Sequence, residues 1–420
     1  MGGRSFPSGQ SEGSTVRPIQ TLPAAVLLFG LGAAPFGSTA FAAAETQAPN
    51  APNQRPAFPG QTRAPDPARP TPVATSVVAD GIAGGWGFEF MSDGRMIVTE
   101  KAGRLRIVAA DGQVGEPLGG VPAVDARGQG GLLDVALSPA FARDRLVYLS
   151  FTEPRERGNG TSVARGRLIE NGGRGRLEDV QVIFRQTPSW ENNLHFGSRL
   201  VFAPDGKLFV TVGERSDRTP RVQAQDLSSG LGKVFRINPD GTAPRDNPFV
   251  GRPGAQPAIW SYGHRNLQSA TLDGQGRLWT VEHGPRGGDE LNRPEAGKNY
   301  GWPEVTYGLE YSGQAVGRGA TQKDGTEQPV YYWDPVIAPS GMAYYDAALF
   351  PAWWGALLVG GLVSQGVVVL RLDGDRVASE ERVPLDARVR DVKVGPDGAV
   401  YALTETRGGT GRILRLAPRS

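Results

Sequence analysis

The stretch DGKLFVTV, residues 205–212, decides the fold of this chain. An Asp-Gly pair favours a tight turn, and the β-branched and aromatic residues that follow it favour a strand. The same turn and strand recur where Asp93-Gly94 precedes MIVTE, Asp273-Gly274 precedes LWTVE and Asp397-Gly398 precedes VYALT. Four copies of one phrase indicate a β protein built from repeated units.

The spacing of these turns indicates the number of units. They lie 112, 68 and 124 residues apart, which corresponds to two, one and two units of about 61 residues. A second phrase, a glycine and a basic residue before alternating apolar positions, begins at Gly103, Gly232 and Gly411. We therefore predict an all-β six-bladed β-propeller over residues 75–420, closed by pairing of its first and last strands. The rival architecture, a pair of β-sandwiches, gives no reason for the phrase to recur across the body.

The composition narrows the possible functions. Gly 59 and Pro 34 among 420 residues are too many turn formers for a helical bundle, and 39% hydrophobic residues are sufficient for a large core. A net charge of +2 argues against a broad nucleic-acid-binding face. Because the sequence contains no cysteine, disulfides, thiolate metal sites and cysteine nucleophiles are excluded.

The N-terminal segment has the order of a secretory signal. Basic residues precede an apolar run from Leu22 to Phe36, and Ala40-Phe41-Ala42 supplies an A-x-A cleavage pattern. We predict a cleaved signal peptide over residues 1–42 and a periplasmic or secreted protein; an uncleaved anchor is the alternative, although the run is short for a membrane span. Residues 43–74 are rich in proline, which predicts an extended linker outside the packed domain.

Three histidines are candidates for acid–base chemistry. His195 lies in NNLHFGSRLVF, just before a predicted strand, while His264 lies in SYGHRN and His283 in EHGPRGGDE. A histidine at a loop-to-strand junction is suited to act as a general base, and a buried structural histidine is the alternative for each. Their spacing does not support a three-histidine zinc site.

Arginines and one glycine-rich loop are the other candidates. Arg388 and Arg390 alternate on one strand face and, with Arg265, suit a ligand that carries several carboxylates; surface salt bridges are the alternative. The loop from Gly284 to Glu290 offers carboxylates and carbonyl oxygens that suit calcium, although an ordinary turn also explains it. The sequence contains no dinucleotide-binding glycine motif, no P-loop and no G-x-S-x-G nucleophile elbow.

Taken together, these phrases resemble a known family. The chain is similar to the soluble aldose sugar dehydrogenases of the glucose/sorbosone dehydrogenase family, which use pyrroloquinoline quinone (PQQ) and calcium on a six-bladed propeller. The likeness runs from about GIAGGWGFEF at Gly81 to the C-terminus. It is carried by the phrases GQGGLLDVAL from Gly128, HFGSRLVF from His195, SYGHRN from Ser261, EHGPRGGDE from Glu282, KNYGWP from Lys298, APSG from Ala338 and RVRDVKVGPDG from Arg388. Each phrase alone is weak, but their common order along the chain is a strong signal.

The resemblance implies roles for individual residues. His195 matches the catalytic base, which takes the proton of the anomeric hydroxyl while hydride passes to the quinone. The positions that match or resemble PQQ contacts are Gln129, Arg265, Asn266, Tyr311, Ala338, Pro339, Ser340, Gly341, Arg388 and Arg390, with Trp333 as a wall of the pocket. The positions that match calcium ligands are Gly284 and Pro285, through backbone carbonyls, with Glu290 and Tyr300.

Four positions depart from the family pattern. Val363, in GGLVSQG, stands where the resemblance predicts a lysine, so one positive contact to the cofactor is lost unless another basic residue compensates. Leu194 stands where the glucose dehydrogenases place an aspartate beside the base, which favours the aldose branch. His264 is unusual before Arg265, and Leu267 replaces an expected proline.

The resemblance therefore predicts a PQQ- and calcium-dependent dehydrogenase that oxidises aldose sugars at the anomeric carbon to lactones. Its partners would be a small-molecule aldose and a soluble or membrane electron acceptor, with no nucleic acid, and the protein would be a monomer or homodimer. Two alternatives remain open: a non-catalytic propeller that binds sugar or protein, and a calcium-dependent lactonase, which would leave the arginine cluster unexplained.

Overall fold

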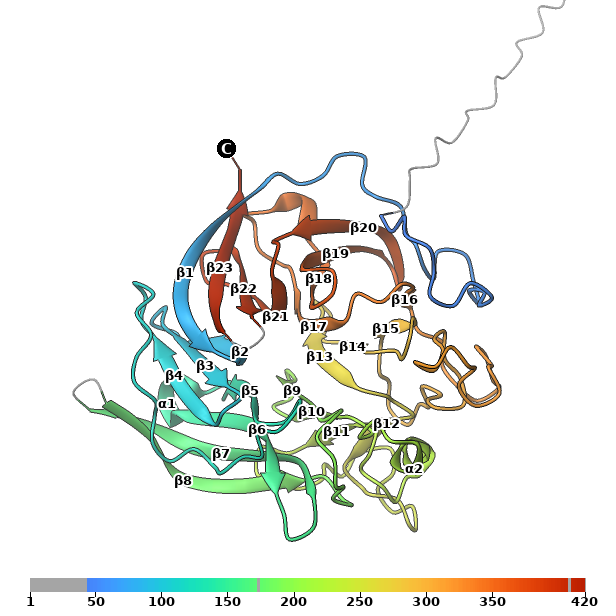
Figure 1. The fold of residues 1–420 in the computed structure, drawn as a ribbon. Helices are drawn as coiled ribbons and strands as arrows, with labels where there is room; N and C mark the ends of the chain where they lie inside the picture. Colours follow the sequence, from blue (N-terminus) through green and yellow to red (C-terminus); the bar gives the residue numbers. More distant parts are fainter. Residues whose placement is uncertain (1–43, 172–173, 407–408, 420) are drawn as a thin grey trace, which may run out of the picture. The chain divides into compact units, whose positions relative to one another are not determined.

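The computed structural model describes residues 44–171, 174–406 and 409–419, and these residues form six small antiparallel sheets arranged around a common centre (Figure 1). The first sheet contains β2 (Gly85–Phe90), β3 (Met96–Glu100) and β4 (Arg104–Val108). The second contains β5 (Leu132–Leu137), β6 (Leu146–Pro154), β7 (Asn159–Asn171) and β8 (Arg174–Arg185). The third contains β9 (Gly197–Phe202), β10 (Leu208–Val212), β11 (Lys233–Ile237) and β12 (Ile259–Tyr262).

The remaining three sheets complete the ring. The fourth contains β13 (Leu267–Leu272), β14 (Leu278–Glu282), β15 (Asp289–Asn292) and β16 (Tyr331–Trp333). The fifth contains β17 (Pro339–Tyr344), β18 (Leu357–Gly361), β19 (Gly366–Asp373) and β20 (Arg376–Pro384). The sixth contains β21 (Arg388–Val394), β22 (Val400–Glu405), β23 (Thr410–Pro418) and β1 (Val73–Ala83). The short helical turns are α1 (Phe141–Asp144), α2 (Arg218–Arg221), η1 (Val222–Gln225) and η2 (Pro351–Trp353).

The ring is closed in the way that the sequence predicts. β1, the first strand of the chain, pairs antiparallel with β23, the last strand, so that Val73 lies opposite Pro418 and Ala83 opposite Thr410. The innermost strands β2, β5, β9, β13, β17 and β21 each contact the next, and β21 contacts β2. The prediction of an all-β six-bladed propeller is therefore confirmed.

Apolar packing between neighbouring blades holds the ring together. A buried apolar cluster lies between each adjacent pair, for example Trp279 and Val281 of blade four against Leu357 and Val359 of blade five. Alternate residues of each strand point to opposite faces of its sheet, so each blade packs against both neighbours. In this radial arrangement the innermost strand of each blade is covered by its neighbours, and the sheet edges lie on the outside of the ring.

The repeated Asp-Gly phrase is the first hairpin of a blade. It connects β2 to β3, β9 to β10, β13 to β14 and β21 to β22. The aspartate stabilises the turn: Asp205 Oδ1 accepts the backbone N–H of Lys207 at 3.0 Å, and Asp397 Oδ1 accepts that of Ala399 at 3.1 Å. Gly206 has φ +78°, in the left-handed region that glycine adopts without steric cost.

The segment between residues 44 and 72 corrects one prediction. It contains almost no regular secondary structure, but it packs against the propeller rather than forming a free linker. Gln61 is fully buried, and its carbonyl accepts the backbone N–H of Tyr332, on the outer strand β16, at 2.8 Å. Asp334 accepts the backbone N–H groups of Asn50 and Ala51 at 2.6 and 2.9 Å. A proline-rich segment suits this position because it can cover an edge strand without forming the regular backbone hydrogen bonds of a β-strand.

The predicted signal peptide, residues 1–42, lies outside the described residues. Within the described ranges, none of the helices has the length and apolar character needed to cross a membrane.

Candidate active site

The inner strands of the six blades create a cavity at each end of the ring. Their last residues, Phe90, Leu137, Phe202, Leu272, Tyr344 and Val394, all line one cavity of about 460 Å³, which we call the opposite cavity. The starts of the same strands line a second cavity of about 260 Å³, which we call the cation-lined cavity. Its lining residues are Trp86, Lys101, Gln129, Leu133, Phe196, Gly197, Gln268, His283, Ala338, Leu362, Arg388 and Arg390. The predicted site residues Gln129, Ala338, Arg388 and Arg390 therefore meet at the second cavity.

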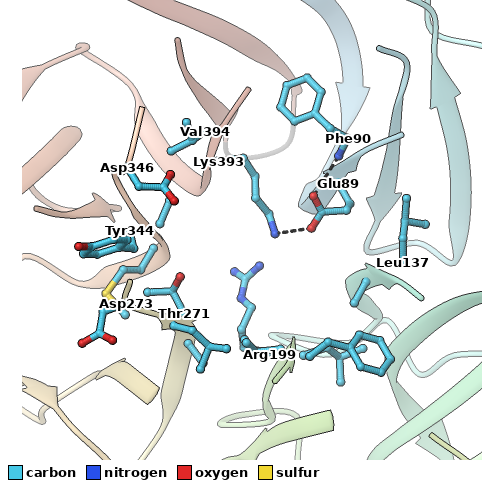
Figure 2. Close-up of a pocket in the computed structure, with 18 of the residues that line it drawn as sticks. Glu89, Phe90, Leu137, Arg199, Thr271, Asp273, Tyr344, Asp346, Lys393 and Val394 are labelled. Carbon is cyan, nitrogen blue, oxygen red and sulfur yellow. Dashed lines mark hydrogen bonds and ion pairs between the residues drawn. The ribbon is translucent and has the colours of Figure 1, made fainter. Parts of the chain in front are cut away.

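The opposite cavity is lined by more acidic than basic side chains, and its cations Arg199 and Lys393 are both paired with carboxylates. Lys393 Nζ pairs with Glu89 at 2.8 Å, and Figure 2 shows this pair with Arg199 beside it. Arg199 is buried and contacts two carboxylates, Asp134 at 2.8 Å and Asp391 at 3.1 Å. The guanidinium of Arg199 also lies 4.5 Å from the ring centre of Trp86, which lines the cation-lined cavity. Arg199 is therefore in contact with the walls of both cavities.

The cation-lined cavity has more positive than negative charge. Arg388 and Arg390 project from β21 and share one carboxylate, Glu405, at 2.7 and 2.8 Å. Lys101, directly after β3, donates to the carbonyl oxygen of Gly128 at 2.7 Å. Three cations and one shared carboxylate make the cavity suited to an anionic ligand.

His195 lies beside this cavity and has the geometry of a general base. Its backbone N–H donates to Gln129 Oε1 at 2.8 Å, and the next residues, Phe196 and Gly197, line the cavity. Its ring Nδ1 lies 3.2 Å from a carboxylate oxygen of Glu214. If Nδ1 carries the proton donated to Glu214, Nε2 carries the lone pair, and among the described residues the hydrogen bonds of this ring involve Nδ1 alone.

The electrostatic surroundings keep His195 neutral. Burial lowers its pKa below the ordinary value of 6.5, and the nearby cations Arg265 and Arg215 lower it further, whereas the carboxylate of Glu214 opposes them. A neutral imidazole with a fixed tautomer is the form that accepts a proton.

The backbone around His195 is held in an uncommon conformation. His195 has φ +49° and Ser198 has φ +95°, both in the left-handed region. Arg215, which is fully buried, donates to Leu194 O at 3.0 Å and to Asn192 O at 2.9 Å, so it secures the loop before the base. The carboxylate of Glu214 also accepts the backbone N–H of Ser216. These bonds fix both members of the His195–Glu214 pair.

The imidazole nitrogens of the other two histidines are hydrogen-bonded within the protein. His264 is fully buried, and its two ring nitrogens lie within hydrogen-bond distance of Glu282 and Ser261, at 3.0 and 2.8 Å. His283 Nε2 lies 2.7 Å from Pro339 O, which makes it the donor, and burial lowers the pKa of His283 to about 3. His195 alone of the three therefore combines a carboxylate partner on one nitrogen with a second nitrogen left for chemistry.

Arg265 and Asn266 present unused hydrogen-bond donors. Arg265 Nη1 donates to the carbonyl oxygens of His283 and Gly284 at 2.9 and 2.8 Å, but its Nε is buried without a partner among the described residues. Asn266 Oδ1 accepts the backbone N–H of Gly197, while its Nδ2 is likewise buried and unpaired in the described chain. Buried donors without acceptors are costly, so both atoms are suited to gain an oxygen acceptor, although Arg265 and Asn266 are not among the residues that line the cation-lined cavity.

The predicted calcium residues meet at a much smaller cavity. Gly284, Glu290 and Tyr300 line a space of about 10 Å³, together with Glu282 and Arg265, and His283 lines both this space and the cation-lined cavity. Pro285 is buried beside Gly284 but is not a lining residue. The Tyr300 hydroxyl donates to Arg293 O at 2.6 Å and accepts the backbone N–H of Glu295 at 3.0 Å, which leaves the backbone carbonyl of Tyr300 as its available oxygen.

Acidic side chains near this space do not form a cluster of three or more metal ligands within the described ranges. Burial and the neighbouring Glu282 raise the pKa of Glu290 well above its ordinary value. The Oδ1 atom of Asn292, a further oxygen donor, is buried without a partner in the part of the chain described. The available ligands are therefore mostly neutral oxygens, which suit a hard cation better than a transition metal.

The residues from Ala338 to Gly341 do not all face the cavity. Ala338 lines it with φ +49°, whereas Pro339 O accepts the bond from His283. Ser340 Oγ donates to Val389 O at 2.6 Å and thereby connects β17 to β21. At Gly341 a Cβ atom would lie 2.0 Å from Asp391 Oδ1, so this position permits a close approach between the blades.

Two predicted aromatic contacts differ from the expectation. Tyr311 is 71% exposed and reaches the site only through its hydroxyl, 3.5 Å from Arg265 Nη2. Trp333 is not a wall of the cavity: it is buried in the core between blades four and five, and its Nε1 donates to Glu380 at 3.0 Å. The prediction for Trp333 is therefore wrong, because alternation along β16 points this ring into the core.

Sequence reasoning did not identify Lys101 or Glu214. Lys101 directly follows the buried strand MIVTE, and Glu214 lies one residue beyond the buried strand LFVTV. A charged residue at the end of an inner hairpin strand is the signal that would have suggested them.

Comparison with known proteins agrees with this geometry. The family model described as glucose/sorbosone dehydrogenase matches residues 82–415. The aldose sugar dehydrogenase YliI of Escherichia coli is 42% identical over 84% of this chain and 95% of that protein. A crystal structure of a glucose dehydrogenase is 44% identical, with a TM-score of 0.78, and covers 83% of this chain and 100% of that one. The PQQ-bound aldose sugar dehydrogenase of Streptomyces coelicolor is 31% identical, with a TM-score of 0.69, over 84% of this chain and 100% of that one.

Proposed function

Since this chain belongs to the glucose/sorbosone dehydrogenase family, we propose that it is a PQQ-dependent enzyme that oxidises aldose sugars at the anomeric carbon to lactones. The observation that supports this activity most directly is the buried His195–Glu214 pair beside a cavity with excess positive charge. A base and an anion-binding cavity in contact are what such an oxidation requires.

The residues around the cation-lined cavity fit the quinone. Arg388 and Arg390 would pair with its carboxylates, and Gln129 would lie alongside it. The unpaired donors Arg265 Nε and Asn266 Nδ2 would gain acceptors when it binds. When bound, PQQ supplies an acceptor for the two electrons that leave the sugar as hydride from the anomeric carbon.

His195 would carry the proton transfer. Its Nε2 would accept the proton of the anomeric hydroxyl as the C–O bond becomes the carbonyl of the lactone, while Glu214 stabilises the resulting imidazolium through Nδ1–H. The substrate thus loses one proton to His195 and one hydride to the cofactor.

We also propose calcium as the second cofactor, held by Gly284 and Pro285 through carbonyl oxygens, with Glu290 and the carbonyl of Tyr300. The support is that Gly284, Glu290 and Tyr300 line one small space directly adjoining the cation-lined cavity through His283. A hard cation there would polarise an oxygen of the bound quinone.

The N-terminal pattern supports the further proposal that the protein is exported with cleavage after Ala42, to the periplasm or the cell exterior. Sequencing the N-terminus of the protein recovered from the culture would test it, with Ala43 as the expected first residue.

A titration tests the enzymatic proposal. The protein from Ala43 onward, freed of metal, would be titrated with PQQ in the presence and absence of calcium, and reduction of a dye by glucose and other aldoses would be followed. Dye reduction that requires both PQQ and calcium supports the proposal. If PQQ does not bind, the proposal fails, and a binding propeller or a calcium-dependent lactonase becomes the better explanation. Lactone hydrolysis with calcium alone would identify the second of these.

A further inference from the structure

One lysine at the cation-lined cavity has no role in the mechanism proposed above. Lys101 lines this cavity together with Arg388, Arg390 and Gln129. The two arginines already share Glu405, whereas the Lys101 ammonium contacts one carbonyl oxygen, that of Gly128 at 2.7 Å, and forms no ion pair within the described residues. It is therefore the lining cation whose charge is least compensated.

The backbone of Lys101 is held rigidly between blades one and two. Its N–H donates to Gly84 O at 2.9 Å, and its carbonyl accepts the N–H of Leu132 at 3.1 Å. At Gly131, which has φ +137°, a Cβ atom would lie 2.2 Å from Lys101 O, so only glycine allows this approach. A side chain on a fixed backbone loses less entropy when it binds a ligand.

The surroundings of Lys101 also favour an anion. Burial lowers the pKa of Lys101 and the positive charge of Arg390 lowers it further, while the carboxylate of Glu405, already shared by two arginines, opposes them only in part. A carboxylate brought in by a ligand would supply further compensation and stabilise the ammonium ion.

Val363 gives a second reason to consider this lysine. The family resemblance predicts a lysine at this position, and the chain has a valine that is 54% exposed, next to Leu362 in the cavity wall. The cavity nevertheless contains a lysine, contributed by blade one rather than by the loop after β18.

We propose that Lys101 binds a carboxylate of PQQ and thereby replaces the cationic contact that is absent at Val363. This inference rests on the proposed function. The ammonium ion would move from the carbonyl of Gly128 to the carboxylate, or share its protons between both, because it has three donors.

The experiment measures affinity rather than turnover. PQQ is titrated into the calcium-supplemented protein, and quenching of tryptophan fluorescence is followed, because Trp86 lines the same cavity. Lys101→Met should raise the Kd about tenfold, equivalent to ~1.4 kcal/mol, and should weaken the dependence of affinity on salt. Lys101→Arg should retain most of the affinity, since it keeps the charge.

A matched control exists in the opposite cavity, at the other end of the ring. Lys393→Met removes a lysine that pairs with Glu89 in the opposite cavity, so its Kd for PQQ should equal that of the wild type. Melting temperatures of the PQQ-free variants show whether Lys101→Met is folded like the wild type. Wild-type affinity in a folded Lys101→Met variant would overturn the role of Lys101 and leave the proposed function intact. Absence of PQQ binding by the wild type would overturn both.

Discussion

The two ends of the propeller ring are made by the same six inner strands, yet the charges of their cavities are arranged differently. At the opposite cavity, Lys393 pairs with Glu89, and Arg199 contacts Asp134 and Asp391. At the cation-lined cavity, two arginines share one carboxylate, and within the described ranges the Lys101 ammonium hydrogen-bonds to a carbonyl and forms no ion pair. Because both ends share one scaffold, the excess charge reflects the ligand that one end receives and not a requirement of the fold.

The backbone differs between the two ends in the same way. His195, Ser198 and Ala338 lie at the starts of inner strands and have positive φ values of 49°, 95° and 49°. Such conformations cost of order 1–3 kcal/mol each and persist where surrounding bonds impose them. The strain therefore gathers at the end where a base must be held in a fixed position.

The largest difference between the ends should appear in catalysis. His195→Ala removes the group that the geometry of the site places to accept the substrate proton, so kcat should fall by roughly 10²- to 10⁴-fold. PQQ affinity should change little, because the positive groups of the cavity remain. Steady-state kinetics and a fluorescence titration of PQQ would measure the two quantities separately. Loss of PQQ binding together with activity would instead show that His195 is structural.

The next largest effect should come from the residue between the two cavities. Arg199→Met leaves Asp134 and Asp391 buried without their cation, and breaking such a pair costs about 3–5 kcal/mol. Urea denaturation should show this loss in the free energy of unfolding. Arg412→Met is a suitable control because Arg412 forms an exposed pair with Asp80, and its loss should be much smaller. Equal losses in the two variants would contradict the structural importance of the buried network.

A smaller effect is expected when the partner of the base is changed. In Glu214→Gln the negative charge that raises the pKa of His195 is removed, so the pKa should fall further below 6.5. The acid limb of the kcat/KM profile should therefore move to lower pH, and the plateau should decrease by roughly 10- to 100-fold because a weaker base accepts the proton less readily. A pH profile with an unchanged acid limb would show that Glu214 does not act through His195.

The fold could be predicted because its signal is local. An Asp-Gly turn before an apolar strand is contained in eight residues, and the structure places it in the first hairpin of four blades. The other two blades connect their inner strands through longer loops containing α1 and η2, which hide the repeat but preserve its spacing. The segment from 44 to 72 was misjudged because composition does not show that an edge strand, β16, needs a cover.

The site could be predicted only where its residues share a strand or a motif. Alternation alone placed Arg388 and Arg390 on one face, and both line the cavity. Glu214 approaches His195 across 19 residues, and Lys101 approaches Arg390 from a different blade. The first pair depends on the β9–β10 register within one blade, and the second depends on ring closure, which brings the blade of β3 beside that of β21.

The smallest effect should come from the opposite cavity, where Lys393→Met breaks a partly exposed pair. The side chains of Lys393 and Glu89 are 23% and 30% exposed, and Arg199 still compensates the buried Asp134 and Asp391 that Lys393 also faces, so the loss in the free energy of unfolding should be smaller than in Arg199→Met. The kcat and the Kd for PQQ should equal those of the wild type, because this pair lies at the other ends of the inner strands. Urea denaturation and PQQ titration of the same preparation would test both statements. A fall in PQQ affinity comparable to that of Lys101→Met would mean that charges in both cavities attract PQQ over a long range. Direct contact with the ligand would then not distinguish Lys101 from Lys393.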